Sequence, residues 1–226
     1  MAGAVMAEDA VPLVRFLKWC GLALVGAGVL MVVATLLHPR ETASTIVASE
    51  PRLVAAHVVC TMAWLLVLLG LPGLYAAQRG GMGRLGWVGF LTAFSGTYLI
   101  AVTGNFGFLA PVLPEQWPAV LDALSQYLPV VIINGLAAIL VMVGYIVFGI
   151  AMIRTATLPR WSGVLVAVGA PAHLLGFGIA QLVSTAAWSI AILGCVSLGA
   201  GPAWPDRLWQ KPAGVNLLLS AKSTRA

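Results

Sequence analysis

Three histidines are the residues of this chain with the clearest capacity for chemistry. His57 and His173 lie inside long apolar stretches, and His38 lies at the end of another. Where such stretches sit in a lipid bilayer, an ionisable side chain inside them is costly and usually marks a functional site. Imidazole is also the commonest metal ligand and exchanges protons near neutral pH. What these histidines can do therefore depends on the elements that hold them.

The composition excludes an ordinary soluble domain. The chain has 226 residues, of which 61% are hydrophobic and only 8% are charged. A soluble globular domain carries about 25% charged residues, so this chain lacks the polar surface that water requires. A helix of about 20 apolar residues spans the hydrocarbon core of a bilayer and satisfies its own backbone hydrogen bonds there.

The sequence predicts an all-α fold, a polytopic transmembrane six-helix bundle that forms a single membrane domain. None of the six apolar stretches contains Asp, Glu, Lys or Arg. The predicted helices cover residues 19–37, 53–77, 85–110, 127–153, 161–182 and 186–201, with a tail at 202–226. The loop at 78–84 is predicted to be a tight turn on the inner side.

The basic residues predict the orientation. With the N-terminus inside, ten of the twelve Lys and Arg residues face the cytoplasm, and only Arg40 and Arg52 face out. This asymmetry follows the positive-inside rule and predicts that both termini are cytoplasmic. The net charge of +5 therefore reflects topology, and it does not indicate nucleic-acid binding.

Residues 119–128 are predicted to form an amphipathic helix in the outer interface. Apolar side chains share one helical face there, and Asp122 lies on the other. Trp117 and Tyr127 are expected to anchor this segment in the aromatic belt. The segment is either a simple connector or a lid over an outer pocket.

Small residues and cysteines favour close packing of the bundle. Gly86 and Gly89, and Gly144 and Gly149, are spaced at about one helical turn, which lets helices approach closely within the bundle or in a homodimer. The three cysteines are scattered with no CxxC motif, so they are interpreted as small apolar core residues.

Polar side chains gather in the outer half of the predicted bundle. They are His57, Asn105, Asn134, His173 and, at the interface, Arg52. This distribution predicts an outward-facing pocket around His57, Asn134 and His173. The alternative is that each residue only hydrogen-bonds a neighbouring helix, and for His38 the alternative is simple solvation of a helix end.

Two cofactor hypotheses follow from the histidines. His57 and His173 on different helices could hold haem b axially, with Arg40 and Arg52 pairing with its propionates. Alternatively, His38, His57 and His173 could supply three nitrogen ligands to zinc. No HExxH spacing supports that metal-dependent enzyme, for which Glu41 or Glu115 would act as the base.

Two further hypotheses need no cofactor. The pocket could bind a lipid or a small apolar ligand, or the bundle could be an accessory subunit that packs against other membrane proteins. The lack of intramembrane carboxylates argues against a proton- or sodium-driven pump. Whether the chain is an enzyme stays open at this level.

Three stretches carry a resemblance to known sequences. They are Thr42-Ala-Ser-Thr-Ile-Val-Ala-Ser-Glu-Pro-Arg-Leu-Val, Leu68-Leu-Gly-Leu-Pro-Gly-Leu-Tyr-Ala-Ala-Gln78 and the segment rich in small residues from Leu193 to Trp204. With them the chain resembles uncharacterised six-helix integral membrane proteins of bacteria. The resemblance implies the six-helix plan and an address in the bacterial inner membrane, and it brings no activity with it.

Overall fold

The structure is a computed structural model that describes residues 10–38, 50–104, 112–113, 115–155 and 158–179. Within these residues all regular structure is helical. The helices are α2 (Ala10–Leu37), α4 (Glu50–Ala76), α5 (Arg79–Thr103), α6 (Trp117–Gln126), α7 (Leu128–Thr155) and α8 (Arg160–Ile179). The predicted sixth helix, 186–201, and the tail lie outside the described residues.

Four of these helices are long and apolar enough to cross a membrane. Their candidate spans are Arg15–Leu37, Pro51–Ala76, Gly80–Thr103 and Leu128–Thr155. The shortest has 23 residues, which at about 1.5 Å per residue exceeds the ~30 Å of hydrocarbon. The first four predicted membrane helices are therefore confirmed as apolar helices of spanning length, and α8 is a helix where the fifth was predicted.

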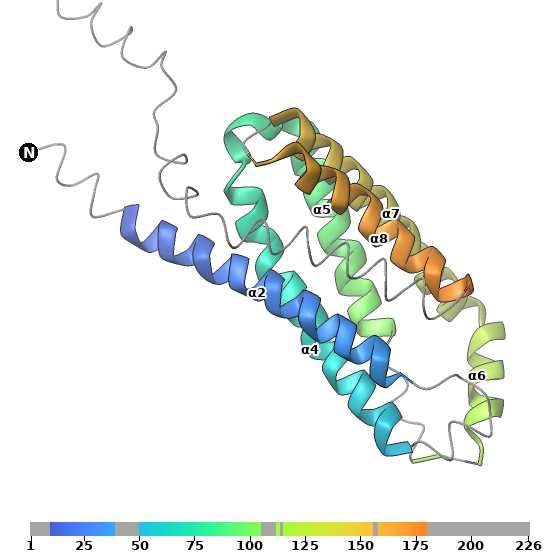
Figure 1. Cartoon of the computed structure of the whole chain (residues 1–226). Coiled ribbons are helices and arrows are strands. Elements are labelled where there is room, and N and C mark those ends of the chain that lie inside the picture. Colours follow the sequence, from blue (N-terminus) through green and yellow to red (C-terminus); the bar gives the residue numbers. More distant parts are fainter. Residues whose placement is uncertain (1–9, 39–49, 105–111, 114, 156–157, 180–226) are drawn as a thin grey trace, which may run out of the picture.

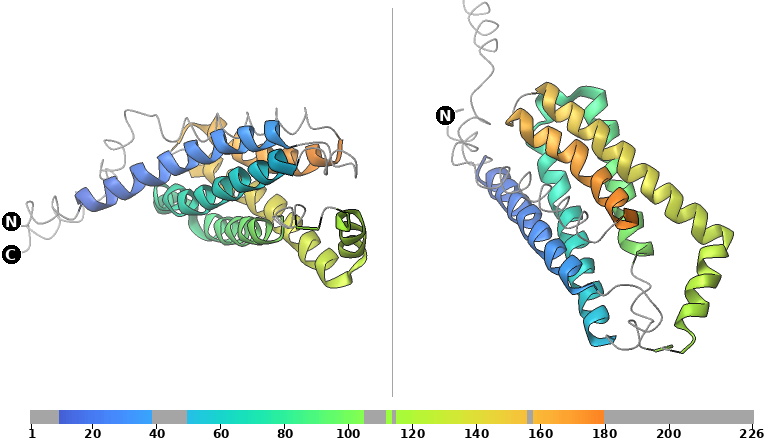
Figure 2. Two further views of the ribbon diagram at one scale, coloured as in Figure 1. Left: turned by 90° about the horizontal axis from the view of Figure 1, so that it is seen from below. Right: turned by 45° about the vertical axis from the view of Figure 1, so that its right-hand side comes forward.

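Consecutive long helices run in opposite directions and pack side by side (Figures 1 and 2). Helix α2 packs along α4, α4 along α5, α5 along α7, and α7 along α8. The last turn of α2, the first turn of α4 and the short helix α6 consequently share one end of the bundle (Figure 1). We call this the α6 end, and it corresponds to the predicted outer side.

Glycines allow α5 and α7 to approach each other closely. A Cβ added to Gly144 would lie 2.3 Å from the backbone nitrogen of Ala93, and one added to Gly89 would lie 2.6 Å from that of Phe148. Both distances are far below van der Waals contact, so only glycine permits this packing. The predicted role of these two glycines in close packing within the bundle is confirmed.

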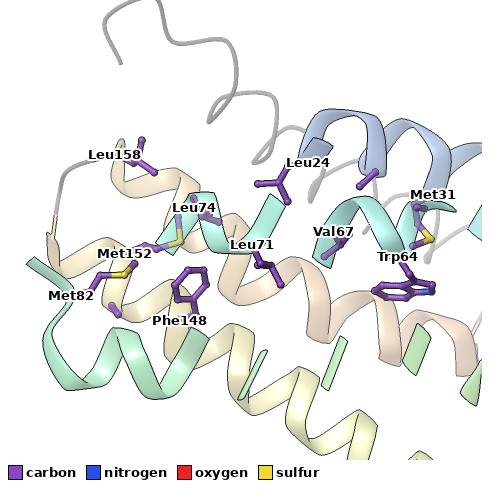
Figure 3. Packing of buried hydrophobic residues seen from close by; sticks show 13 residues of the cluster. Leu24, Met31, Trp64, Val67, Leu71, Leu74, Met82, Phe148, Met152 and Leu158 are labelled. Carbon is purple, nitrogen blue, oxygen red and sulfur yellow. The ribbon is translucent and has the colours of Figure 1, made fainter. Parts of the chain in front are cut away.

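The buried core joins α2, α4, α5 and α7. Phe148 and Met152 of α7 pack with Leu71 and Leu74 of α4, and Leu24 of α2 lies against the same cluster (Figure 3). The opposite faces of the long helices carry many exposed apolar side chains, among them Trp19, Leu69, Val88 and Ile132. Apolar exposure of this extent suits a lipid surface and not water.

The turn between α4 and α5 differs from the predicted loop at 78–84. Helix α5 already begins at Arg79, and a break at Gly83, with φ 55° and ψ −156°, divides its first turn from the rest. That backbone region is essentially restricted to glycine. Gln78 is buried at this turn, where it donates to Leu74 O and accepts a hydrogen bond from Thr155 of α7. The chain reverses here in few residues because helix replaces most of the loop.

Candidate functional site

Two histidines meet at the α6 end of the bundle. His38 follows the last residue of α2, and its backbone N–H donates to Ala34 O at 2.9 Å. His57 lies on α4, and the centroids of the two imidazole rings are 5.3 Å apart in an edge-to-face arrangement. Both side chains are half-buried. Besides ending α2, His38 therefore contacts His57 of α4, and both the ligand-binding role and simple solvation of the helix end stay predictions.

Arg52 closes the end of α2. Its Nε donates to Leu37 O at 2.7 Å, and its terminal nitrogen donates to Leu36 O at 2.9 Å. The last carbonyls of a helix lack intrahelical partners and carry partial negative charge, so a guanidinium stabilises them. Arg52 thus fixes α2 to α4 beside the histidine pair while its side chain stays exposed.

Helix α6 is attached to this same corner. Trp117, at its first residue, is only 2% exposed and packs on Leu53 of α4, with Val120 and Leu121 of α6 around the contact. Leu53 precedes His57 by one helical turn on the same face of α4. The expectation that Trp117 lies in the lipid interface is corrected: its ring is buried against α4. Tyr127 is 60% exposed, as the prediction of an interfacial anchor requires.

Asn134 lies in the outer part of α7, and its side chain is exposed. Its neighbours Val131, Ile132, Ile133 and Leu136 are exposed as well. Ile132 and Leu136 share one face of the helix, whereas Val131 and Ile133 point to nearly opposite sides, so this part of α7 presents apolar surface on more than one side. An amide placed on such a surface is costly in lipid unless it finds a partner.

The structure describes no side chain for two residues of the predicted outer polar cluster, His173 and Asn105. His173 belongs to α8, which packs along α7, but its side chain lies outside the described part of the structure. Asn105 lies outside the described residues altogether. The pocket formed by His57, Asn134 and His173 stays a prediction, as does the pairing of His57 with His173 in a haem b site.

The three-histidine zinc hypothesis also stays a prediction. Within the described residues no three side chains of His, Cys, Asp or Glu converge. His38 and His57 provide two imidazoles, and the third proposed ligand, His173, has no described side chain. Glu115 is exposed, and Glu41 lies outside the described residues.

Sequence reasoning missed two contacts across helices. Cys60 of α4 meets Met31 of α2 with 3.9 Å between the sulfur atoms, and Thr97 of α5 lies 3.0 Å from the hydroxyl of Tyr145 of α7. The signal that could have found the first is the antiparallel register of α2 and α4. If His38 lies beside His57, antiparallel packing places Met31 beside Trp64, one helical turn from Cys60, because one index falls as the other rises.

No protein-family model matches the chain, and neither the curated proteins nor the solved structures contain a match to it. The functional interpretation therefore rests on the residues and their geometry.

Proposed function

We propose that this chain is a multi-pass integral membrane protein that binds a lipid or another small apolar ligand at the α6 end of the bundle. On this proposal α6 is the lid of the binding site, and His57, Arg52 and Asn134 supply its polar contacts. The site faces the outside of a bacterial inner membrane, because ten of twelve basic residues flank the other side of the predicted spans.

One observation carries the proposal: Trp117 seats α6 on Leu53, one turn before His57. A connector between two membrane helices needs no such attachment, whereas a lid needs a fixed hinge close to the polar groups that it covers. Asp122 and Gln126, which share a hydrogen bond of 2.9 Å, are both exposed and lie on the polar face of α6. The apolar face with Val120 and Leu121 turns toward α4.

The apolar surface of α7 beside the lid suits the same class of ligand. Val131 is exposed there and lies one helical turn from Asn134 on the same face of α7. Ligand sites are mostly apolar, with a few polar groups that fix orientation. A molecule with an acyl or isoprenoid portion and a small polar head fits that combination.

Native mass spectrometry of the intact chain, released from detergent micelles, tests the proposal. We expect the wild-type protein to retain a small apolar molecule. Asn134→Leu and His57→Leu should lose it, because each replaces a polar contact with an apolar side chain. Thr155→Val, which removes a polar group at the other end of α7, is the matched control and should retain the molecule.

Retention that is equal in all four proteins would contradict the proposed site. A wild-type protein that carries no small molecule, but purifies with a second membrane protein in fixed ratio, would favour the accessory-subunit alternative. An absorption spectrum of the same sample, oxidised and reduced, tests haem b: a Soret band that is lost in His57→Leu would support that alternative.

A further inference from the structure

Two pairs of side chains that are able to bind metal face each other across the seam between α2 and α4. The first pair is His38 and His57, with ring centroids 5.3 Å apart. The second pair is Met31 and Cys60, whose sulfur atoms are 3.9 Å apart. In each pair one residue comes from α2 or its end and the other from α4. We call these the imidazole pair and the sulfur pair.

The two pairs lie on one stripe of the helix surfaces. Cys60 follows His57 by three residues, and Met31 precedes His38 by seven, so each helix presents both of its residues on the same face. These separations correspond to ~4.5 Å along α4 and ~10 Å along α2 at about 1.5 Å per residue. The sulfur pair therefore lies inward of the imidazole pair, about one to two helical turns deeper.

The spacing within each pair is close to that of two ligands on one ion. At a tetrahedral angle, two imidazoles with metal–nitrogen bonds of about 2.0–2.1 Å have centroids roughly 5.2 Å apart, and two sulfur ligands with bonds of about 2.3 Å lie roughly 3.8 Å apart. The observed separations are 5.3 Å and 3.9 Å. Two ligands on Cu(I) prefer a straight line through the ion, which widens each separation by roughly 1 Å, so each pair has to open by about that much to hold the ion.

The donor set selects the kind of ion. Thiolate and thioether are soft ligands that favour Cu(I), and imidazole also suits copper. Zinc at a structural site calls for four ligands, whereas within the described residues no three of His, Cys, Asp or Glu converge. Cu(I) is satisfied by two ligands. Met31 is 2% exposed and lies in the core cluster beside Trp64, which keeps the sulfur pair away from water.

We propose that the seam between α2 and α4 binds Cu(I) at two successive positions, first at His38 and His57 and then, deeper, at Met31 and Cys60. The ion enters at the α6 end, where the imidazole pair is half-buried, and it is held more tightly at the sulfur pair, where the Cys60 thiol gives up its proton on binding. This inference does not rest on the proposed lipid or small-ligand site.

The test titrates the full-length chain in detergent with Cu(I) alone, without oxygen, against a Cu(I)-specific chelator. We expect the wild-type chain to bind two Cu(I) ions. Met31→Leu combined with Cys60→Ala should bind one, with affinity lower than that of the tighter wild-type site by more than ~10-fold, because even the loss of an outer-shell partner costs about 10–100-fold. X-ray absorption at the copper edge should then show sulfur scattering in the wild type and only nitrogen in this variant.

Two controls separate binding from folding. Cys20→Ala removes the other described thiol, which packs against Gly73 of α4, and Met62→Leu removes an exposed thioether of α4; both should bind two ions. Leucine conserves the volume of methionine, so the double variant is expected to fold. A wild-type chain that retains no copper against the chelator, or a double variant that binds as much as the wild type, would overturn the proposal. Because the double variant leaves Asn134 and His57 in place, it also keeps the outcome separate from that of the small-ligand experiment.

Discussion

Replacing Gly144 by alanine is expected to destabilise the bundle more than any other substitution of comparable size. The added Cβ would lie 2.3 Å from the nitrogen and 2.6 Å from the Cα of Ala93, and 2.7 Å from the carbonyl carbon of Thr92. All three atoms belong to the backbone of α5 and cannot rotate away as a side chain would. The helices must separate, and overpacking of this kind costs about 1–3 kcal/mol, occasionally more.

The matched control lies on the same helix. A Cβ added to Gly135 meets nothing within 4 Å, and alanine is better than glycine in a helix by up to about 1 kcal/mol. Gly135→Ala should therefore be neutral or stabilising. Unfolding by denaturing detergent in mixed micelles, followed by circular dichroism, measures both. Equal stability of the two variants would mean that α5 and α7 do not approach as closely as the structure has them.

Trp117→Ala is expected to release α6 from α4 while the long helices stay folded. Truncation of a buried tryptophan or phenylalanine costs about 3–5 kcal/mol, and here the ring packs on Leu53 of α4. The α6 helix has only 10 residues, too few to be stable alone in water. The loss should consequently appear as local opening and not as unfolding of the bundle.

Hydrogen–deuterium exchange of the protein in nanodiscs measures this opening. Amides of α6 should exchange much faster in Trp117→Ala, and those of α5 and α7 should not change. Tyr127→Ala is the control, because Tyr127 is 60% exposed and contributes little packing within the chain. Slow exchange of α6 in Trp117→Ala would show that another contact holds it, and α6 would then not be a lid hinged at Trp117.

The helices could be predicted because their signal is local. A run of apolar residues without charge has only one stable form in lipid, and its length can be counted. The ends were harder, since a helix can continue into polar sequence: α2 begins at Ala10 and α5 at Arg79, both earlier than predicted. Residues 79–82, which the sequence places in a loop, form a helical turn, and the break at Gly83 separates this turn from the rest of α5.

The site depended on contacts that hydropathy does not encode. The sequence predicts that His57 lies in the outer half of the bundle but does not predict its partner, because the partner depends on how α2 and α4 align. The contact of His38 with His57 could for that reason not be predicted. Trp117 was assigned to the interface from its type, whereas the burial of a tryptophan is decided by what packs on it, here Leu53. Register between helices is the missing information in both cases.

The most direct test of a membrane-spanning bundle with its α6 end outside is cysteine labelling of intact cells by a membrane-impermeant maleimide. Ser125→Cys places a thiol on the exposed face of α6, and Gly80→Cys places one in open space at the opposite end; the wild-type chain gives the background. We expect Ser125→Cys to react in intact cells and Gly80→Cys to react only after the membrane is opened. Reaction of Gly80→Cys in intact cells, with Ser125→Cys protected, would reverse the orientation, and equal reaction of both would contradict a bundle that spans the membrane.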